Sequence, residues 1–81
     1  MPSKADIAAE IIAQATARGV GKTICPSEVS RAMTQDWRGL MPHVRAVAGD
    51  LAKEGQIIVT QKGCVVQAQT AVGPIRLGLP R

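Results

Sequence analysis

The fold is decided by residues 22–55, KTICPSEVSRAMTQDWRGLMPHVRAVAGDLAKEG. Near the start of this stretch, Pro26 suits the first position of a helix, because its missing N–H would have no partner there. Glu28 stands two residues later, where its carboxylate can reach back to the residue before the helix. These two signals predict a short helix over residues 26–33.

A longer helix follows after a turn. Its apolar residues fall at spacings of four, three and four, in the order Leu40, Val44, Val47, Leu51. Such a stripe is typical of a helix with one buried face, and Gly55 is typical of the position just after its end. Asp36 can cap the start. Pro42 would remove a hydrogen bond from a regular helix, so we expect a helix over 37–54 with an irregular start, a short turn at 37–40 preceding the main part.

The residues before this stretch predict another helix. Ser3 and Asp6 form an S-x-x-D start signal, and an apolar side then recurs at helical spacing, which predicts a helix over 3–18. Between it and the short helix, residues 23–24 are expected to form a short edge strand.

The residues after Gly55 predict strands. QIIVTQ, residues 56–61, is rich in β-branched side chains, and Lys62-Gly63 is a turn candidate. The return strand has two candidates: a tight hairpin through 64–67, or PIRLGL at 74–79 after a long loop. We favour 74–79, with a brief return at 64–66, because Ile75 and Leu77 alternate with an outward Arg76.

Taken in order, these elements predict an α+β fold in one domain covering residues 1–81. Three helices accompany a small two- to three-stranded antiparallel sheet. The order of short helix, turn, longer helix and hairpin is that of a helix-turn-helix with an attached wing.

Composition narrows the possible functions. Hydrophobic residues make up 46% of the 81 residues and charged residues 20%, which is ordinary for a globular domain. Trp37 is the single aromatic residue, so the core must be aliphatic and stacking platforms for single-stranded nucleic acids are lacking. No apolar run approaches the roughly 20 residues that span a membrane, and the N-terminus does not resemble a signal peptide. We expect a cytoplasmic protein without a membrane partner.

The sequence gives little indication of catalysis. Cys25 and Cys64 lie in unrelated contexts without a CxxC pair, so we expect free, buried or half-buried thiols and no metal site. His43 is the only imidazole, and Asp50 and Glu54 form an isolated carboxylate pair. We therefore expect no catalytic residues, no cofactor and no enzymatic activity.

Charge favours a polyanionic partner. The formal net charge is +4, and all six acidic residues precede Gly55. The longer helix also has a basic face of small and cationic residues, expected to point outward: Arg38, Pro42, Arg45, Ala46, Gly49, Lys53. Small residues would let this face approach a groove closely.

From these features we expect a module that binds double-stranded DNA, with the longer helix in the major groove and a basic wing on the backbone. The residues expected to contact DNA are Ser27, Arg31, Arg38, His43, Arg45, Gly49, Lys53, Lys62 and Arg76. With about four to six phosphate contacts, affinity should fall by roughly two to four powers of ten between 50 and 200 mM salt.

The alternative is a protein–protein interaction module, with the apolar segment around Val65, Val66 and Val72 as a contact surface. If Arg38 and Arg45 are paired with acidic residues, the groove-reading face is neutralised and this alternative is favoured; the candidate partners are Asp36, Glu28 and Asp50. For either function we expect a monomer or a weak homodimer.

Several motifs carry a resemblance to a known family: ICPSEV, DWR, LMP with the following VR, VTQKG and GPIRL. In this combination, over nearly the whole chain, the sequence resembles a small bacterial family catalogued as domain of unknown function 3253. The resemblance implies a bacterial domain of winged-helix type and brings no activity with it. The segment CVVQAQTAV departs from the family pattern and implies a more apolar wing.

Overall fold

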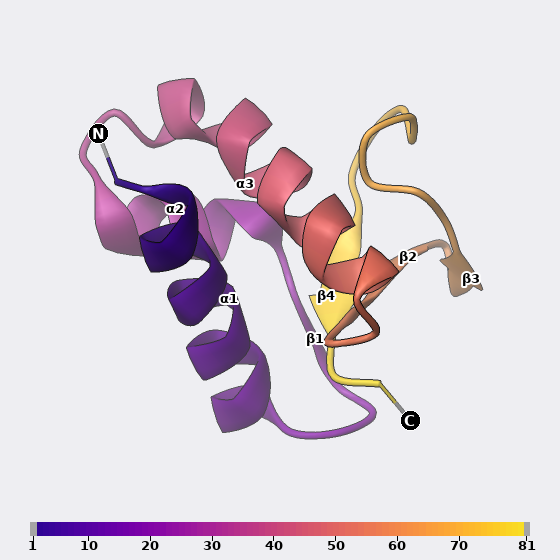
Figure 1. Ribbon diagram of the computed structural model, residues 1–81. Helices are drawn as coiled ribbons and strands as arrows, with labels where there is room; N and C mark the ends of the chain where they lie inside the picture. The colour runs from indigo at the N-terminus through magenta and orange to yellow at the C-terminus, as the bar shows by residue number, and fades with distance from the viewer. Residues whose placement is uncertain (1, 81) are drawn as a thin grey trace.

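A computed structural model describes residues 2–80. The elements follow in the order α1 (Lys4–Arg18), β1 (Thr23–Ile24), α2 (Pro26–Met33), α3 (Trp37–Lys53), β2 (Ile58–Gln61), β3 (Cys64–Val65) and β4 (Arg76–Gly78). The three helices gather on one side, and the sheet lies beside the C-terminal half of α3 (Figure 1). This is an α+β fold of winged-helix-like arrangement.

The sheet has four antiparallel strands in the order β1-β4-β2-β3, against the two to three strands predicted. The two return strands left open by the sequence both form. β3 pairs with β2 through Gln61 and Cys64, and β4 pairs with β2 on its other side, placing Val59 opposite Leu77. The strands β2 and β4 are shorter than the predicted 56–61 and 74–79.

The start of α3 differs from the prediction. The helix is continuous from Trp37, with Pro42 inside it, and no separate turn precedes it. Pro42 cannot donate to the Arg38 carbonyl, but both residues are exposed, so water can satisfy that oxygen. Burial of Leu40 and Val44 on the opposite side favours the unbroken helix. The side chain of Asp36 makes no capping hydrogen bond.

The end of α3 follows the predicted signal. Gly55 has φ 77°, and the N–H groups of Gly55 and Gln56 donate to the carbonyls of Ala52 and Leu51 at 3.0 and 2.9 Å. This pair of bonds is the Schellman arrangement, which needs a residue free of a side-chain clash at positive φ. It turns the chain from α3 into β2.

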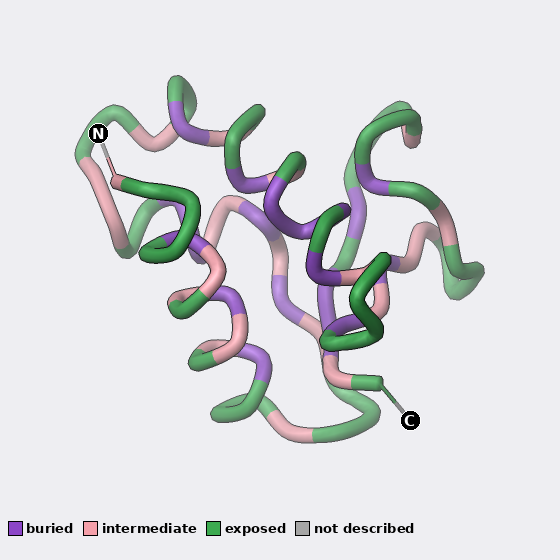
Figure 2. The backbone as a smooth tube through the Cα atoms, viewed as in Figure 1, coloured by how far each residue is buried: buried purple, intermediate pink, exposed green. Residues whose placement is uncertain are grey.

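The core is aliphatic, as the composition predicts. Buried side chains come from every element except β3 and meet in one cluster, including Ile11, Val29, Val44, Val59 and Leu77. Figure 2 shows the buried stretches facing inward from the three helices and the sheet. The stripe Leu40, Val44, Val47 and Leu51 belongs to this cluster, which fixes the side that α3 presents to the outside.

Candidate nucleic-acid interface

The outer face of α3 is narrower than the sequence predicts. Its exposed residues are Arg38, Gly39, Pro42, His43, Ala46, Asp50 and Lys53. These positions form one stripe at helical spacing, with small residues along the middle. Arg45 and Gly49, which were expected on this face, lie at its edge beneath another segment of the chain.

That segment runs from Val66 to Pro74 and is called the strap here. It leaves β3, passes beside α3 and returns to β4 (Figure 1). Arg45 fastens it: Nη1 donates to the Gly73 carbonyl at 3.1 Å and Nη2 to the Ala71 carbonyl at 2.6 Å. Contrary to the prediction, Arg45 does not project freely from the outer face, because both Nη atoms of its guanidinium group donate to backbone carbonyls of the strap.

Gly49 is also covered by the strap. It is buried, and a Cβ atom at this position would overlap the carboxamide of Gln69. Ala68, beside Gln69, is 2% exposed. The prediction of Gly49 as an outward contact was wrong: its missing side chain admits the strap. Gln61 fastens the strap from β2, donating through Nε2 to the carbonyls of Val72 and Pro74 at 2.6 and 3.1 Å.

Arg76 points outward from β4, between the buried Ile75 and Leu77, as the alternation predicts. Its guanidinium group is nevertheless engaged at the edge of the sheet. Nε donates to Thr23 Oγ1 at 2.9 Å, Nη2 to the Thr23 carbonyl at 3.2 Å, and Nη1 to Cys25 Sγ at 2.7 Å. Arg76 therefore joins β4 to β1 and to the start of α2.

The start of α2 depends on Glu28. Its Oε2 accepts the backbone N–H of Cys25 at 2.7 Å, and its Oε1 pairs with Arg18 Nη2 at 2.7 Å. The backbone hydrogen bond from Cys25, followed by Arg18, lowers the pKa of Glu28. Ser27, beside it, is half-buried and lines a shallow apolar cavity with Met41.

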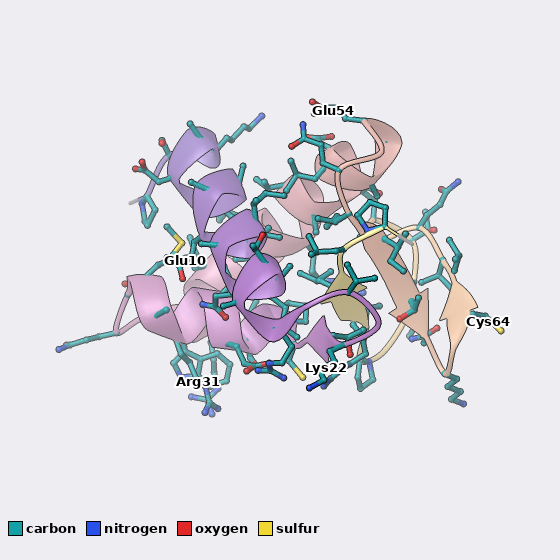
Figure 3. The ribbon with its side chains drawn as sticks, turned by 90° about the horizontal axis from the view of Figure 1, so that it is seen from below. Glu10, Lys22, Arg31, Glu54 and Cys64 are labelled. Atoms are coloured by element: carbon teal, nitrogen blue, oxygen red, sulfur yellow. The ribbon has the colours of Figure 1, made fainter. Side chains whose placement is uncertain are left out.

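Arg31 and Arg38 meet at Trp37. The guanidinium carbons of Arg31, in the last turn of α2, and of Arg38, in the first turn of α3, lie 4.2 and 4.4 Å from the centroid of the Trp37 ring. Both arginines are exposed, and Arg31 points away from the body of the protein (Figure 3). Both arginines are among the predicted contacts, whereas Trp37 is not, although it is the only aromatic residue and directly precedes Arg38.

Three further predicted contacts are exposed. His43 and Lys53 lie on the outer stripe of α3, and Lys62 occupies the turn between β2 and β3 with φ 53°. The structure thus brings Arg38, His43 and Lys53 onto one helix face and Arg31 next to its start. It separates Arg45, Gly49 and Arg76 from that face.

The exposed cations of α3 are not engaged in salt bridges among residues 2–80. Within residues 2–80, the pair between Arg18 and Glu28 is the one salt bridge, so neither Arg38 nor Arg45 is neutralised by a described carboxylate. Among the same residues no group of three metal-ligating side chains occurs. Cys25 is half-buried as expected, whereas Cys64 is exposed on the edge strand β3, so the expectation of a covered thiol there was wrong.

The three helices and antiparallel sheet place the protein in the class of small α+β, winged-helix-like proteins. Residues 4–80 match the family described as protein of unknown function DUF3253, and the chain belongs to this family. A search of curated proteins found no match. In the described part of the chain, no helix has the length and apolar character that crossing a bilayer requires.

Proposed function

We propose that this protein binds double-stranded DNA through the outer stripe of α3 and the neighbouring Arg31. The observation that carries the proposal is the pair of exposed arginines, Arg31 and Arg38, which have no carboxylate partner among residues 2–80. Unpaired guanidinium groups beside a helix of small outward residues suit a negatively charged groove.

In this arrangement the N-terminal half of α3 enters the major groove. Gly39, Pro42 and Ala46 allow close approach, and His43 reaches base edges from the same stripe. Arg31 and Arg38 hold the backbone at one end. Lys53 and Lys62 supply further phosphate contacts, and Asp50 weakens binding between them. Arg45 and Arg76 are left out of the proposed surface, because several N–H groups of each guanidinium group already donate within the protein.

Titration of a labelled mixed-sequence duplex, followed by fluorescence anisotropy, tests the proposal. Four cations, Arg31, Arg38, Lys53 and Lys62, give a salt slope of about −3 to −4, or roughly a hundredfold loss of affinity between 50 and 200 mM salt. Absence of binding at 50 mM salt would refute it.

Matched variants locate the surface. Replacing Arg31 or Arg38 with Gln should weaken binding and reduce the magnitude of the salt slope by about one. Lys4→Gln removes the same charge from exposed α1, outside the proposed surface, and should leave the slope unchanged. Equal effects of all three substitutions would show that binding depends on net charge alone and not on the proposed surface.

A protein partner is the second candidate. Val65 on β3 and Val72 on the strap are 75% and 90% exposed, and apolar side chains on an edge strand suit a protein contact. Val65→Glu, on the edge strand β3, separates the two functions: it should leave affinity for duplex DNA within a fewfold but abolish binding of a protein partner at this edge.

A further inference from the structure

Trp37 holds two like charges together. The guanidinium groups of Arg31 and Arg38 would repel each other in water, yet both lie within 4.4 Å of the centroid of one indole ring. The negative face of an aromatic ring attracts each cation and offsets part of that repulsion. The result is two exposed cations fixed in one place.

The position of the ring is set by the turn between α2 and α3. The hydroxyl of Ser30, which is fully buried, donates to the Trp37 carbonyl. Leu40, one turn further along α3, is anchored in the core. Trp37 itself is half-buried, and its carbonyl is held from inside by the buried Ser30. The arginines thus rest on a rigid support.

Besides Arg31, the charges next to Arg38 are those of the helix end and of Asp36. Arg38 lies in the first turn of α3, at the positive end of the helix dipole. This first turn contains no acidic residue. Asp36, just before the helix, has its carboxylate over Gly39. An anion bound at Arg31 and Arg38 would therefore gain two guanidinium groups as donors and meet the competing carboxylate of Asp36.

We propose that Arg31, Trp37 and Arg38 form a preorganised phosphate-binding clamp. The two arginines bind one phosphate or two neighbouring phosphates of one strand, and Trp37 is a positioning residue that sets their spacing without stacking on a base. Guanidinium groups match phosphate through paired N–H donors. This inference rests on the proposed function, in which the bound phosphates belong to the DNA backbone.

Because Trp37 is the only aromatic residue, its fluorescence reports on the clamp directly. The ratio of the iodide to the caesium quenching constant should be larger for Trp37 than for free N-acetyltryptophanamide, since anions gather at the arginines. Tripolyphosphate and a short duplex should each protect against iodide, and Arg31→Gln/Arg38→Gln should remove the excess iodide quenching. Poly-glutamate at equal charge should protect severalfold less.

Substitution of Trp37 separates positioning from charge. In anisotropy titrations, Trp37→Leu should weaken duplex binding by about fivefold with an unchanged salt slope, because both cations remain but lose their support. Trp37→Phe should lie between Trp37→Leu and the wild type. Far-UV circular dichroism checks that each variant is folded.

The outcomes distinguish the clamp from DNA binding. Protection by tripolyphosphate without duplex binding supports the clamp and refutes the DNA proposal. The clamp is refuted if the duplex binds without protecting Trp37 from iodide and Trp37→Leu binds the duplex as tightly as the wild type does. The DNA proposal then stands. Equal protection by poly-glutamate overturns the phosphate assignment. Asp36→Asn should strengthen tripolyphosphate binding severalfold, and a loss of binding there would contradict the charge argument.

Discussion

Glu28 is the residue whose protonation is most directly coupled to the fold. Its carboxylate accepts the Cys25 N–H at the start of α2 and pairs with Arg18 of α1. A carboxylate stabilised in its charged form has a lower pKa in the folded state than the value of 4.5 for an unperturbed Glu. The stabilisation is therefore present above pH 4.5 and is lost as the pH falls through the lower, folded pKa.

Glu28→Gln should therefore destabilise the protein near pH 7, and the difference should shrink as the pH falls through the lowered pKa of Glu28, where the wild-type carboxylate becomes protonated. Urea denaturation of both proteins at several pH values measures the difference in the free energy of unfolding. A difference that stays constant from neutral to acidic pH would show that Glu28 acts through packing and not through its charge.

At the scale of elements, the sequence predicts helices better than it predicts what covers them. The apolar stripe from Leu40 to Leu51 correctly predicts the buried side of α3. Arg45 was misplaced because helical periodicity indicates a side of the helix, whereas its partners, the carbonyls of Ala71 and Gly73, lie on a distant segment without a periodic pattern. Contrary to the prediction, Pro42 does not break the helix, because its missing hydrogen bond lies on the exposed side, where water can replace it, while Leu40 and Val44 pack in the core.

The strap is expected to be held on α3 mainly through Arg45. Arg45→Ala removes two charge-assisted hydrogen bonds and should cost about 1–3 kcal/mol in the free energy of unfolding. It should also speed amide hydrogen exchange selectively in residues 68–73. Hydrogen exchange followed by mass spectrometry measures this.

Arg38→Ala, the same substitution at an exposed arginine near the start of the same helix, is the matched control and should leave exchange in the strap unchanged. Arg45→Lys should restore little of the lost stability and of the slow exchange in the strap, because an ammonium group cannot span two carbonyls as the planar guanidinium group does. Slow exchange in the strap of Arg45→Ala would mean that Ala68 and Gln61 suffice to hold it.

For the whole molecule, the order of strands is the feature that sequence could not supply. β4 is the last strand in the chain yet lies between β1 and β2, with Leu77 opposite both Ile24 and Val59. Alternation in PIRL correctly predicts that Leu77 is buried, but pairing between residues so distant in sequence depends on the closed fold. The candidate interface was predictable in part. The sequence identified its cations, but which of them are hydrogen-bonded within the protein depends on tertiary contacts.

The central position of Leu77 predicts how the protein unfolds. Leu77→Ala should cost about 2–5 kcal/mol, against a total of about 4–12 kcal/mol for a domain of this size. At an m-value of about 1–2 kcal/mol/M in urea, its midpoint should fall by about 1–5 M. Val72→Ala, at a position that is 90% exposed, should leave the midpoint unchanged. Because helices and sheet share one core cluster, Trp37 fluorescence and far-UV circular dichroism should follow the same transition in both variants. If Trp37 kept its folded emission after the dichroism signal had been lost, the α2–α3 turn would be stable without the sheet, and the rigidity of the phosphate clamp would be local to the two helices.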